Sequence, residues 1–404
     1  MDITLTQHPV GQGGMMSGLL ATSSSQFHWV YDCGSNQTGD LNREIDVVAA
    51  KGDVDVLFLS HLDSDHISGI DRLLSKTRVP EVVLPYLNEI DRLVAAAHDL
   101  ATGKASGTFL TFLSDTAGWF SQRGVERITY ITPRGDDDGQ DDNGPDIPIE
   151  GGDDGGQGLK PEWSRDGKPA DHSSADTPSS MPSGLELETK ATLQFDLPGK
   201  LNWLLAPYAH RPSDKMLDVF KAAVKAMFTG WNNPAFLSTL IGNKAHRDTL
   251  RDCYDLIWAD HNLVSMALYA GPWHSSNRHT ESWHSYRNDR YWFGSDPGHA
   301  IAWLGTGDMH LNVGRRRKAF LAHYAKLIDK VNVFGLPHHG SDRNFDLSLL
   351  SALHQANKYV AAAGANSYGH PGQMVRRAVR SHGKKFIHVS SSIHSALEWK
   401  HFMR

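Results

Sequence analysis

Apolar and polar positions alternate in short runs through the first third of the chain. The run from Val54 to Ser60 is almost continuously apolar and of strand length, as in a strand that is covered on both faces. Two later runs have apolar residues at helical spacing. The strands we expect are residues 3–6, 16–22, 27–31, 54–60 and 82–84, and the helices are residues 89–100 and 108–121.

A similar pattern returns in the second half of the chain. It predicts a hairpin over residues 185–205 and then two helical segments, residues 215–228 and a second that ends near 258. The remaining strands we expect are residues 263–269, 300–305, 331–336 and 359–363, and the helices are residues 316–328 and 372–381. Two strand-rich halves with helices indicate an α/β fold, a layered sandwich of two sheets flanked by helices.

Between the two halves, residues 132–184 are rich in Asp, Gly, Ser and Pro and poor in large apolar residues. Such a segment buries too little surface to offset its chain entropy, which predicts a disordered insertion that could contact a protein partner. A calcium loop at Asp136–Asp138, Asp141 and Asp142 is the alternative, but the EF-hand spacing is missing. The predicted division is residues 1–131, the insertion at 132–184, a hairpin with a helical insertion at 185–260, and residues 261–404.

The charge of the chain does not indicate a substrate class. The net charge is −6, but nine acidic residues and no Lys or Arg lie between Asp136 and Asp154. Without that stretch, 37 acidic residues face 40 basic ones, a balance that neither repels a polyanion nor indicates a nucleic-acid-binding protein.

The two cysteines, Cys33 and Cys253, cannot form a disulfide framework, which favours a reducing compartment. The first residues have no basic region followed by an apolar stretch, and no window reaches the roughly 20 apolar residues that span a bilayer. We therefore expect a soluble, cytoplasmic protein.

Four potential metal ligands follow the apolar strand that ends at Ser60. They are His61, Asp63, Asp65 and His66. Imidazole and carboxylate ligands suit zinc, and carboxylates shift the preference toward manganese. The alternative is a polar loop in which Asp63 or Asp65 caps a helix.

Two later strands also end in candidate ligands. Asp308 follows the apolar run 300–304, and His338 and His339 follow residues 331–336. Three strands that each end in His or Asp are what a ligand cluster at one edge of a sheet requires.

These segments together resemble the metallo-β-lactamase superfamily and, more narrowly, the hydrolase domain of the ComEC-type DNA-uptake proteins and its free-standing relatives. The resemblance implies an αββα sandwich of two mixed sheets, and it leaves the central third of the chain uncovered. The segments that carry it are Val10–Gly13, Tyr31–Gly34, Ser60–Gly69 (SHLDSDHISG), Asn262–Ser265, Gly307–Asp308, Pro337–Ser341 and Tyr368–Pro371.

The resemblance also implies roles for these residues and one or two divalent metal ions, Zn or Mn. His61 and Asp63 would hold one metal, Asp65 and His66 the other, and Asp308 would bridge them, with His338 or His339 completing the second site. His370 would lie at the substrate phosphate, and Asp65 would orient a hydroxide made by the metal. Asp32 is expected to support the ligands rather than to react.

Two departures from the family pattern stand out. Most members have His where Asp63 stands, although the ComEC-like branch accepts Asp there. The histidine that usually completes the first site has no clear counterpart. The candidates are His98, His210, His261 and His274.

The sequence therefore predicts a metal-dependent hydrolase, in first place a phosphodiesterase or nuclease acting on nucleic acid or another phosphodiester. Arg315–Lys318 would contact a phosphate backbone or form a solvated helix end. Aromatic residues between Trp273 and Phe293 would stack bases or cover the core. The alternatives are a hydrolase of a small ester (a cyclic nucleotide, a phosphorylcholine ester or a lactone) and a component of an assembly with secondary catalysis. The oligomeric state is not indicated.

Overall fold

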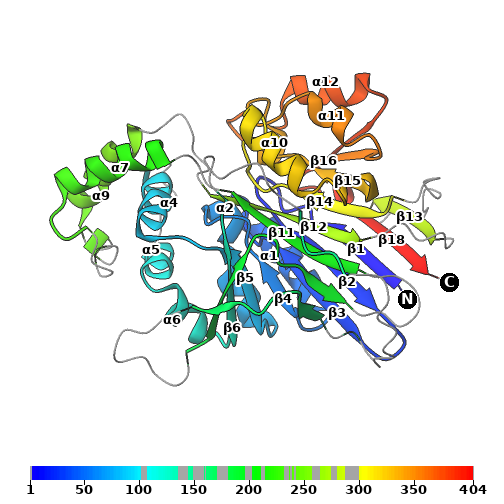
Figure 1. The fold of residues 1–404 in the computed structure, drawn as a ribbon, viewed down its shortest axis with the longest axis horizontal. Coiled ribbons are helices and arrows are strands. Elements are labelled where there is room, and N and C mark those ends of the chain that lie inside the picture. The colour runs from blue at the N-terminus through cyan, green and yellow to red at the C-terminus, as the bar shows by residue number, and fades with distance from the viewer. Residues whose placement is uncertain are drawn as a thin grey trace.

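The structure is a computed structural model of the 404-residue chain. It describes residues 2–101, 107–134, 144–148, 159, 161–170, 181–195, 203–210, 214–231, 236, 239–240, 243–256, 264–273, 280–286 and 300–403. Two mixed β-sheets pack face to face, with helices on both outer faces (Figure 1). This is the αββα sandwich expected from the sequence.

The first sheet has the strand order β13-β18-β1-β2-β3-β4-β5-β6-β9-β8. From β3 to β9 neighbouring strands run parallel, whereas β13, β18, β1, β2 and β3 pair antiparallel. The strands are β1 (Asp2–Gln7), β2 (Met16–Ala21), β3 (Gln26–Tyr31), β4 (Val56–Phe58), β5 (Glu81–Pro85), β6 (Arg127–Thr132), β8 (Lys168–Pro169), β9 (Ser183–Glu188), β13 (Thr280–Tyr286) and β18 (Leu397–Met403).

The second sheet has the order β17-β16-β15-β14-β12-β11-β10-β7. Strands β14 to β17 run parallel, and the others pair antiparallel. The strands are β7 (Pro161–Trp163), β10 (Leu193–Phe195), β11 (Trp203–His210), β12 (Ser265–Pro272), β14 (Ala302–Gly305), β15 (Val331–Gly335), β16 (Lys358–Ala362) and β17 (Lys385–Val389).

Helices cover both sheets (Figure 1). Beside the first sheet lie α1 (Thr38–Ala49), α2 (Ser64–Ile67), α3 (Ile70–Lys76), α4 (Glu89–Ala101), α5 (Gly107–Ser114) and α6 (Thr116–Ser121), with α7 (Asp214–Met227) and α9 (Lys244–Asp255) packed against α4. On the second sheet lie α10 (Gly314–His323), α11 (Ser348–Ala352) and α12 (Gln373–Ser381), and the short 3-10 helices are η1 (Ile328–Lys330), η2 (His338–Gly340) and η3 (Ile393–Ser395). No helix in the described part of the chain is long and apolar enough to cross a bilayer.

The core consists of three apolar layers, one between the sheets and one under each set of helices. Trp29 from β3 and Trp303 from β14 meet in the middle layer, with ring centroids 5.8 Å apart. The strands that precede the candidate ligands are buried on both faces, as their continuous apolar runs predict.

Three of the predicted elements differ from the structure. The expected helix 108–121 is two helices, because Asp115 leaves the helical conformation and its carboxylate accepts a hydrogen bond from the Gly118 amide, which caps α6. The expected hairpin 185–205 is wrong, since β9 joins the first sheet and only β10 and β11 form a hairpin. The helix expected to reach residue 328 ends at His323, where the buried Tyr324 donates to the Ala206 carbonyl of the second sheet.

The prediction of disorder over residues 132–184 is wrong for part of that segment. Strand β7 pairs with β10 and β8 pairs with β9, so both sheets are extended by it. Polar contacts hold this part in place: the Trp163 indole donates to Glu81, and Arg165 pairs with Asp146 and Glu188. The acidic residues Asp136–Asp138, Asp141 and Asp142 lie outside the described residues.

Candidate metal centre

The loop that follows β4 carries four of the predicted ligands. His61 comes three residues after the strand ends, and Asp63 precedes the one-turn helix α2, which contains Asp65 and His66. All four residues are buried. Asp63 is the N-cap residue of α2, as the alternative of a capping loop supposed, but its side chain makes no capping hydrogen bond.

Two glycine-containing turns fix this loop from behind. The Gly14 amide donates to the carbonyls of Gly34 and Asp65, and the Cys33 amide donates to the His66 carbonyl. The turn at Val10–Gly14 is therefore a structural support for the ligand loop.

His61, His66 and Asp308 form one group of donors that could hold a metal ion. The two carboxylate oxygens of Asp308 face different histidines. Asp308 Oδ2 lies 3.6 Å from His61 Nε2, and Asp308 Oδ1 lies 3.4 Å from His66 Nε2. Asp308 thus occupies the central position that the resemblance implies for a bridging ligand.

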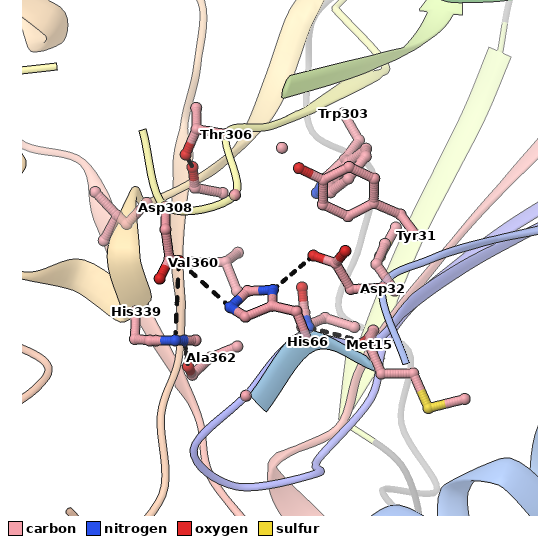
Figure 2. Close-up of a pocket in the computed structure, with 18 residues that line it drawn as sticks. Met15, Tyr31, Asp32, His66, Trp303, Thr306, Asp308, His339, Val360 and Ala362 are labelled. Carbon is pink, nitrogen blue, oxygen red and sulfur yellow. Dashed lines mark hydrogen bonds and ion pairs between the residues drawn. The ribbon is translucent and has the colours of Figure 1, made fainter. Parts of the chain in front are cut away.

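Asp65, His66 and His339 form a second group among the described residues. His339 Nε2 lies 3.6 Å from Asp65 Oδ2 and 3.9 Å from Asp308 Oδ1. The opposite nitrogen, His339 Nδ1, is 2.9 Å from the Ala362 carbonyl oxygen, which fixes the ring with Nε2 toward the group (Figure 2).

The residues present fit a divalent metal ion. The Nε2 atoms of His61, His66 and His339 are buried and have no hydrogen-bond partner among the described residues. Buried polar nitrogens are rarely left in this state unless they bind a ligand. Nitrogen and carboxylate donors at these separations are the ligands of zinc and manganese sites.

Behind His66, a buried carboxylate holds the imidazole. Asp32 Oδ2 lies 2.8 Å from His66 Nδ1 (Figure 2). Asp32 Oδ2 also accepts a hydrogen bond from the Ser60 hydroxyl at 2.7 Å, and Asp32 Oδ1 accepts one from the Ser60 amide. A histidine whose second nitrogen bonds to a carboxylate is the usual arrangement at metal sites. Asp32 thus supports a ligand, as expected, and Ser60 is a further supporting residue that the sequence reasoning did not single out.

Three residues of the site have left-handed backbone conformations that non-glycine residues seldom adopt. They are Asp32 (φ 59°), His338 (φ 48°) and His339 (φ 56°). Such outliers persist only where surrounding structure enforces them, and they concentrate at functional sites.

The adjacent histidines His338 and His339 have different surroundings. The His339 side chain is 4% exposed and joins Asp65 and His66, whereas the His338 side chain is 27% exposed, with its Nε2 3.6 Å from Asp308 Oδ2. His370 lies next to His338, with ring centroids 5.0 Å apart. His338 and His370 therefore form the more open side of the cluster.

The electrostatics of the cluster favour a bound cation. Burial alone would raise the pKa of Asp308, but the neighbouring histidines, His338 first and then His66, hold it well below its usual value. Burial would lower the pKa of His66, but Asp308 and Asp32 raise it well above its usual value. A proton or a metal ion at this position neutralises carboxylates that are removed from water.

Burial lowers the pKa of both open-side histidines. Burial lowers the pKa of His338 to about 3, against the opposing effect of Asp308. Burial also lowers the pKa of His370 to about 4, with His339 acting in the same direction. Each neutral ring has one N–H donor and one acceptor nitrogen.

Of the four histidines considered for the first site, the structure brings His98 to the cluster. His98 Nδ1 lies 3.1 Å from Asp63 Oδ2, and Asp63 Oδ2 lies 3.6 Å from His61 Nε2. His210 instead lines a separate cavity with Ser265 and residues 309–311. His261 and His274 lie outside the described residues.

The four basic residues predicted to meet a phosphate backbone differ in exposure. Arg315 and Lys318 are exposed, and Arg316 is buried in the cavity that His210 lines. Arg317 contacts Asp346 at 3.2 Å and donates to the Leu311 and Asn312 carbonyls. Of the aromatic residues considered for base stacking, Trp273 is buried and packs in the outer core layer of the second sheet, and the side chains of the others lie outside the described part.

Comparisons with known proteins agree with this geometry. The model of the metallo-β-lactamase superfamily matches residues 19–160, which include the ligand run from His61 to His66. The comparison with curated proteins found no match. The matched segment contains part of the donor cluster, so this part of the chain is similar to the metallo-β-lactamase superfamily.

Three solved structures are similar to parts or all of the chain. The metallo-β-lactamase fold protein YhfI from Bacillus subtilis is 9% identical over 99% of this chain and 100% of its own, with a TM-score of 0.38. The subclass B3 metallo-β-lactamase MEM-A1 from a soil metagenome library is 24% identical over 21% of this chain and 31% of its own, with a TM-score of 0.16. A motif mutant of a metallo-β-lactamase from Cronobacter sakazakii is 26% identical over 24% of this chain and 35% of its own, with a TM-score of 0.16. The chain spans about a third of the length of these two β-lactamases.

Proposed function

We propose that this protein is a metal-dependent phosphodiesterase, with nucleic acid as its substrate class. The observation that carries the proposal is the central carboxylate Asp308, whose two oxygens each face a different histidine. Asp308 Oδ1 also lies 3.9 Å from His339 of the second group, which shares His66 with the first. Two adjacent metal ions are typical of phosphatases and nucleases, in which they stabilise both the attacking and the leaving oxygen. The resemblance of the motifs to the ComEC-type hydrolase domain supports the same substrate class.

The proposed ligands are the residues of the two groups, namely His61, Asp65, His66, Asp308 and His339, together with Asp63, whose Oδ2 lies 3.6 Å from His61 Nε2. A divalent metal ion held by them would supply a Lewis acid and lower the pKa of water toward 7. His66 is kept in place by Asp32, and His339 by the Ala362 carbonyl, so the donors are oriented before any metal binds.

The remaining roles belong to Asp65 and to the two histidines on the open side of the cluster. Asp65 is buried next to His339 and can accept a proton from the attacking water. Burial lowers the pKa values of His370 and His338, which favours neutral rings that can each donate one N–H to a phosphoryl oxygen. We assign His370 to the substrate phosphate on this basis.

A substrate screen tests the proposed class. Metal-loaded protein should hydrolyse bis(p-nitrophenyl) phosphate and single-stranded DNA or RNA, and Asp65→Ala should lose this activity by a factor of about 100 or more. Carboxylic esters and lactones serve as the comparison. Hydrolysis of those esters alone, with no turnover of any phosphodiester, would exclude the proposal and favour a small-ester hydrolase.

Substitution of the exposed basic residues of α10 distinguishes a nucleic-acid substrate from a small phosphodiester. Neutralising Arg315 and Lys318 together (both to Gln) should weaken single-strand binding and reduce the slope of log affinity against log salt by about 0.7 for each lost contact. Hydrolysis of bis(p-nitrophenyl) phosphate should be unchanged, because neither side chain belongs to the donor cluster. Absence of any DNA affinity at low salt, in wild type and variant alike, would restrict the proposal to small phosphodiesters.

A further inference from the structure

The loop between β16 and α12 brings an exposed aromatic ring to the open side of the cluster. Tyr368 is 54% exposed, and its ring centroid lies 5.8 Å from that of His370, with an angle of 32° between the two planes. The His370 ring in turn lies beside His338, whose Nε2 is 3.6 Å from Asp308 Oδ2. Three rings therefore lead from the solvent to the central carboxylate of the cluster.

Hydrogen bonds hold this loop in shape. The Asn366 amide nitrogen donates to two backbone carbonyls of the loop, and its side-chain oxygen accepts from the backbone amides of Tyr368 and His370. Gln37, the N-cap residue of α1, donates to the Ala365 carbonyl, so the loop is also tied to the helices beside the first sheet. A ring whose backbone is fixed in advance loses little conformational freedom when a ligand binds.

Helix α12 follows the loop and adds positive charge on its solvent side. It contains Arg376, Arg377 and Arg380 and no acidic residue. Arg377 and Arg380 are exposed and lie on one face with Gln373, at the helical spacing i, i+4 and i+7. Neither arginine forms an ion pair with an acidic residue that the structure describes, unlike Arg317 of α10. Their charges are therefore available to an anionic ligand.

An exposed aromatic ring beside unpaired cations is the combination with which proteins bind single-stranded nucleic acid. Bases stack on the ring while the cations follow the phosphate backbone, and every base can stack because every base has a flat face. The order of the groups suits such a strand, since Tyr368 adjoins His370, to which we assign the substrate phosphate, and the arginines follow on α12.

We infer that Tyr368 stacks on a base of a single-stranded substrate and that Arg377 and Arg380 contact its phosphate backbone. This inference rests on the proposed phosphodiesterase, and it narrows the substrate class to strands whose bases are unpaired next to the reacting phosphate. A duplex does not meet this requirement, because its bases are stacked inside the helix and offer no free face to the ring.

The competing role for Tyr368 is to cover His370 without touching the substrate. An abasic strand separates the two roles, because it has the same phosphates as a normal strand but no bases. Loss of a stacking contact weakens binding of the normal strand alone. Loss of a structural support for His370 weakens binding of both strands equally.

The experiment measures binding of a fluorescein-labelled oligodeoxyadenylate, and of an abasic oligomer of equal length, to the whole chain by fluorescence anisotropy. Low salt favours binding, and EDTA prevents cleavage of either strand. We expect Tyr368→Ala to weaken oligodeoxyadenylate binding by a factor of about 5 or more and to leave the affinity for the abasic oligomer unchanged. Tyr368→Phe, which keeps the ring, should bind both strands as the wild type does.

The arginines have a different expected effect. The double variant Arg377→Gln, Arg380→Gln should weaken binding of both strands alike and reduce the slope of log affinity against log salt by about 0.7 for each lost contact. Met227→Ala is the control, since it removes an exposed side chain from α7, which lies apart from α12 in Figure 1. This control should bind both strands as the wild type does.

Three results would overturn the inference. Tyr368→Ala that binds oligodeoxyadenylate like the wild type, or that loses affinity for both strands equally, would exclude the base contact and leave the proposed phosphodiesterase standing. An unchanged salt slope in the arginine variant would exclude the backbone contact. A wild type that binds neither strand would remove nucleic acid as the substrate class, and metal-dependent hydrolysis of bis(p-nitrophenyl) phosphate would then show whether the phosphodiesterase itself stands.

Discussion

At the scale of single residues, the candidate site is defined by how its side chains are held. Each histidine of the two donor groups has one nitrogen directed at the cluster, and the opposite nitrogen is fixed by a neighbour: Ser60 for His61, Asp32 for His66 and a backbone carbonyl for His339. This pairing fixes the ring orientation before any ion binds. Metal affinity should therefore depend on residues that never touch the metal.

Asp32 offers the clearest test of this dependence. Asp32→Asn keeps a residue that accepts the left-handed conformation (φ 59°) but weakens the charged hydrogen bond to His66. We expect metal affinity to fall by a factor of about 10–100, measured by competition with a chromophoric chelator. Asp55→Asn is the matched control, since Asp55 bonds to the His28 amide before β4 begins. Equal affinities in wild type and Asp32→Asn would show that Asp32 does not support His66.

At the scale of elements, the ligand run depends on turns that pack against its backbone. A Cβ atom on Gly34 would lie 2.3 Å from the carbonyl carbon of His66, a distance that no real contact allows. Gly39, five residues later in α1, has no atom within 4 Å of the corresponding position. The two glycines therefore differ in what surrounds them.

Replacing each glycine by alanine should give opposite results. Gly34→Ala should lower the free energy of unfolding by about 1–3 kcal/mol, the usual cost of forcing atoms into filled space, and weaken metal binding by displacing His66. Gly39→Ala should be neutral or stabilise the protein by up to about 1 kcal/mol. Chemical denaturation and metal titration of both variants provide the measurement. A Gly34→Ala protein as stable as the wild type would mean that the turn does not constrain the loop.

The elements also show what sequence patterns can predict. The runs before His61, Asp308 and His338 are short, buried strands whose candidate ligands follow within a few residues, as the local pattern predicted. The expected cluster at one edge of a single sheet is wrong, because β4 lies in the first sheet whereas β14 and β15 lie in the second. The contact of His98 with Asp63 depends on how α4 packs against α9. The sequence pattern of α4 alone does not predict this packing. Likewise β7 and β8 have few apolar residues, and they form because a sheet edge and polar partners are available.

At the scale of the whole molecule, two sheets meet so that both contribute to one site. The loop after β4 belongs to the first sheet, whereas Asp308 and His339 follow strands of the second. A metal ion at the cluster would join the two sheets and would stabilise the folded state in proportion to its affinity and concentration. The central claim is that this shared cluster binds metal.

Metal content tests that claim most directly. Wild type and Asp308→Asn are each incubated with Zn²⁺ or Mn²⁺, dialysed against metal-free buffer without chelator and analysed by inductively coupled plasma mass spectrometry. We predict that the wild type retains one or two divalent ions per chain and that Asp308→Asn retains fewer, because the carboxylate that faces both donor groups is lost. A wild type that retains no divalent ion, or an Asp308→Asn protein that retains as many as the wild type, would contradict the account.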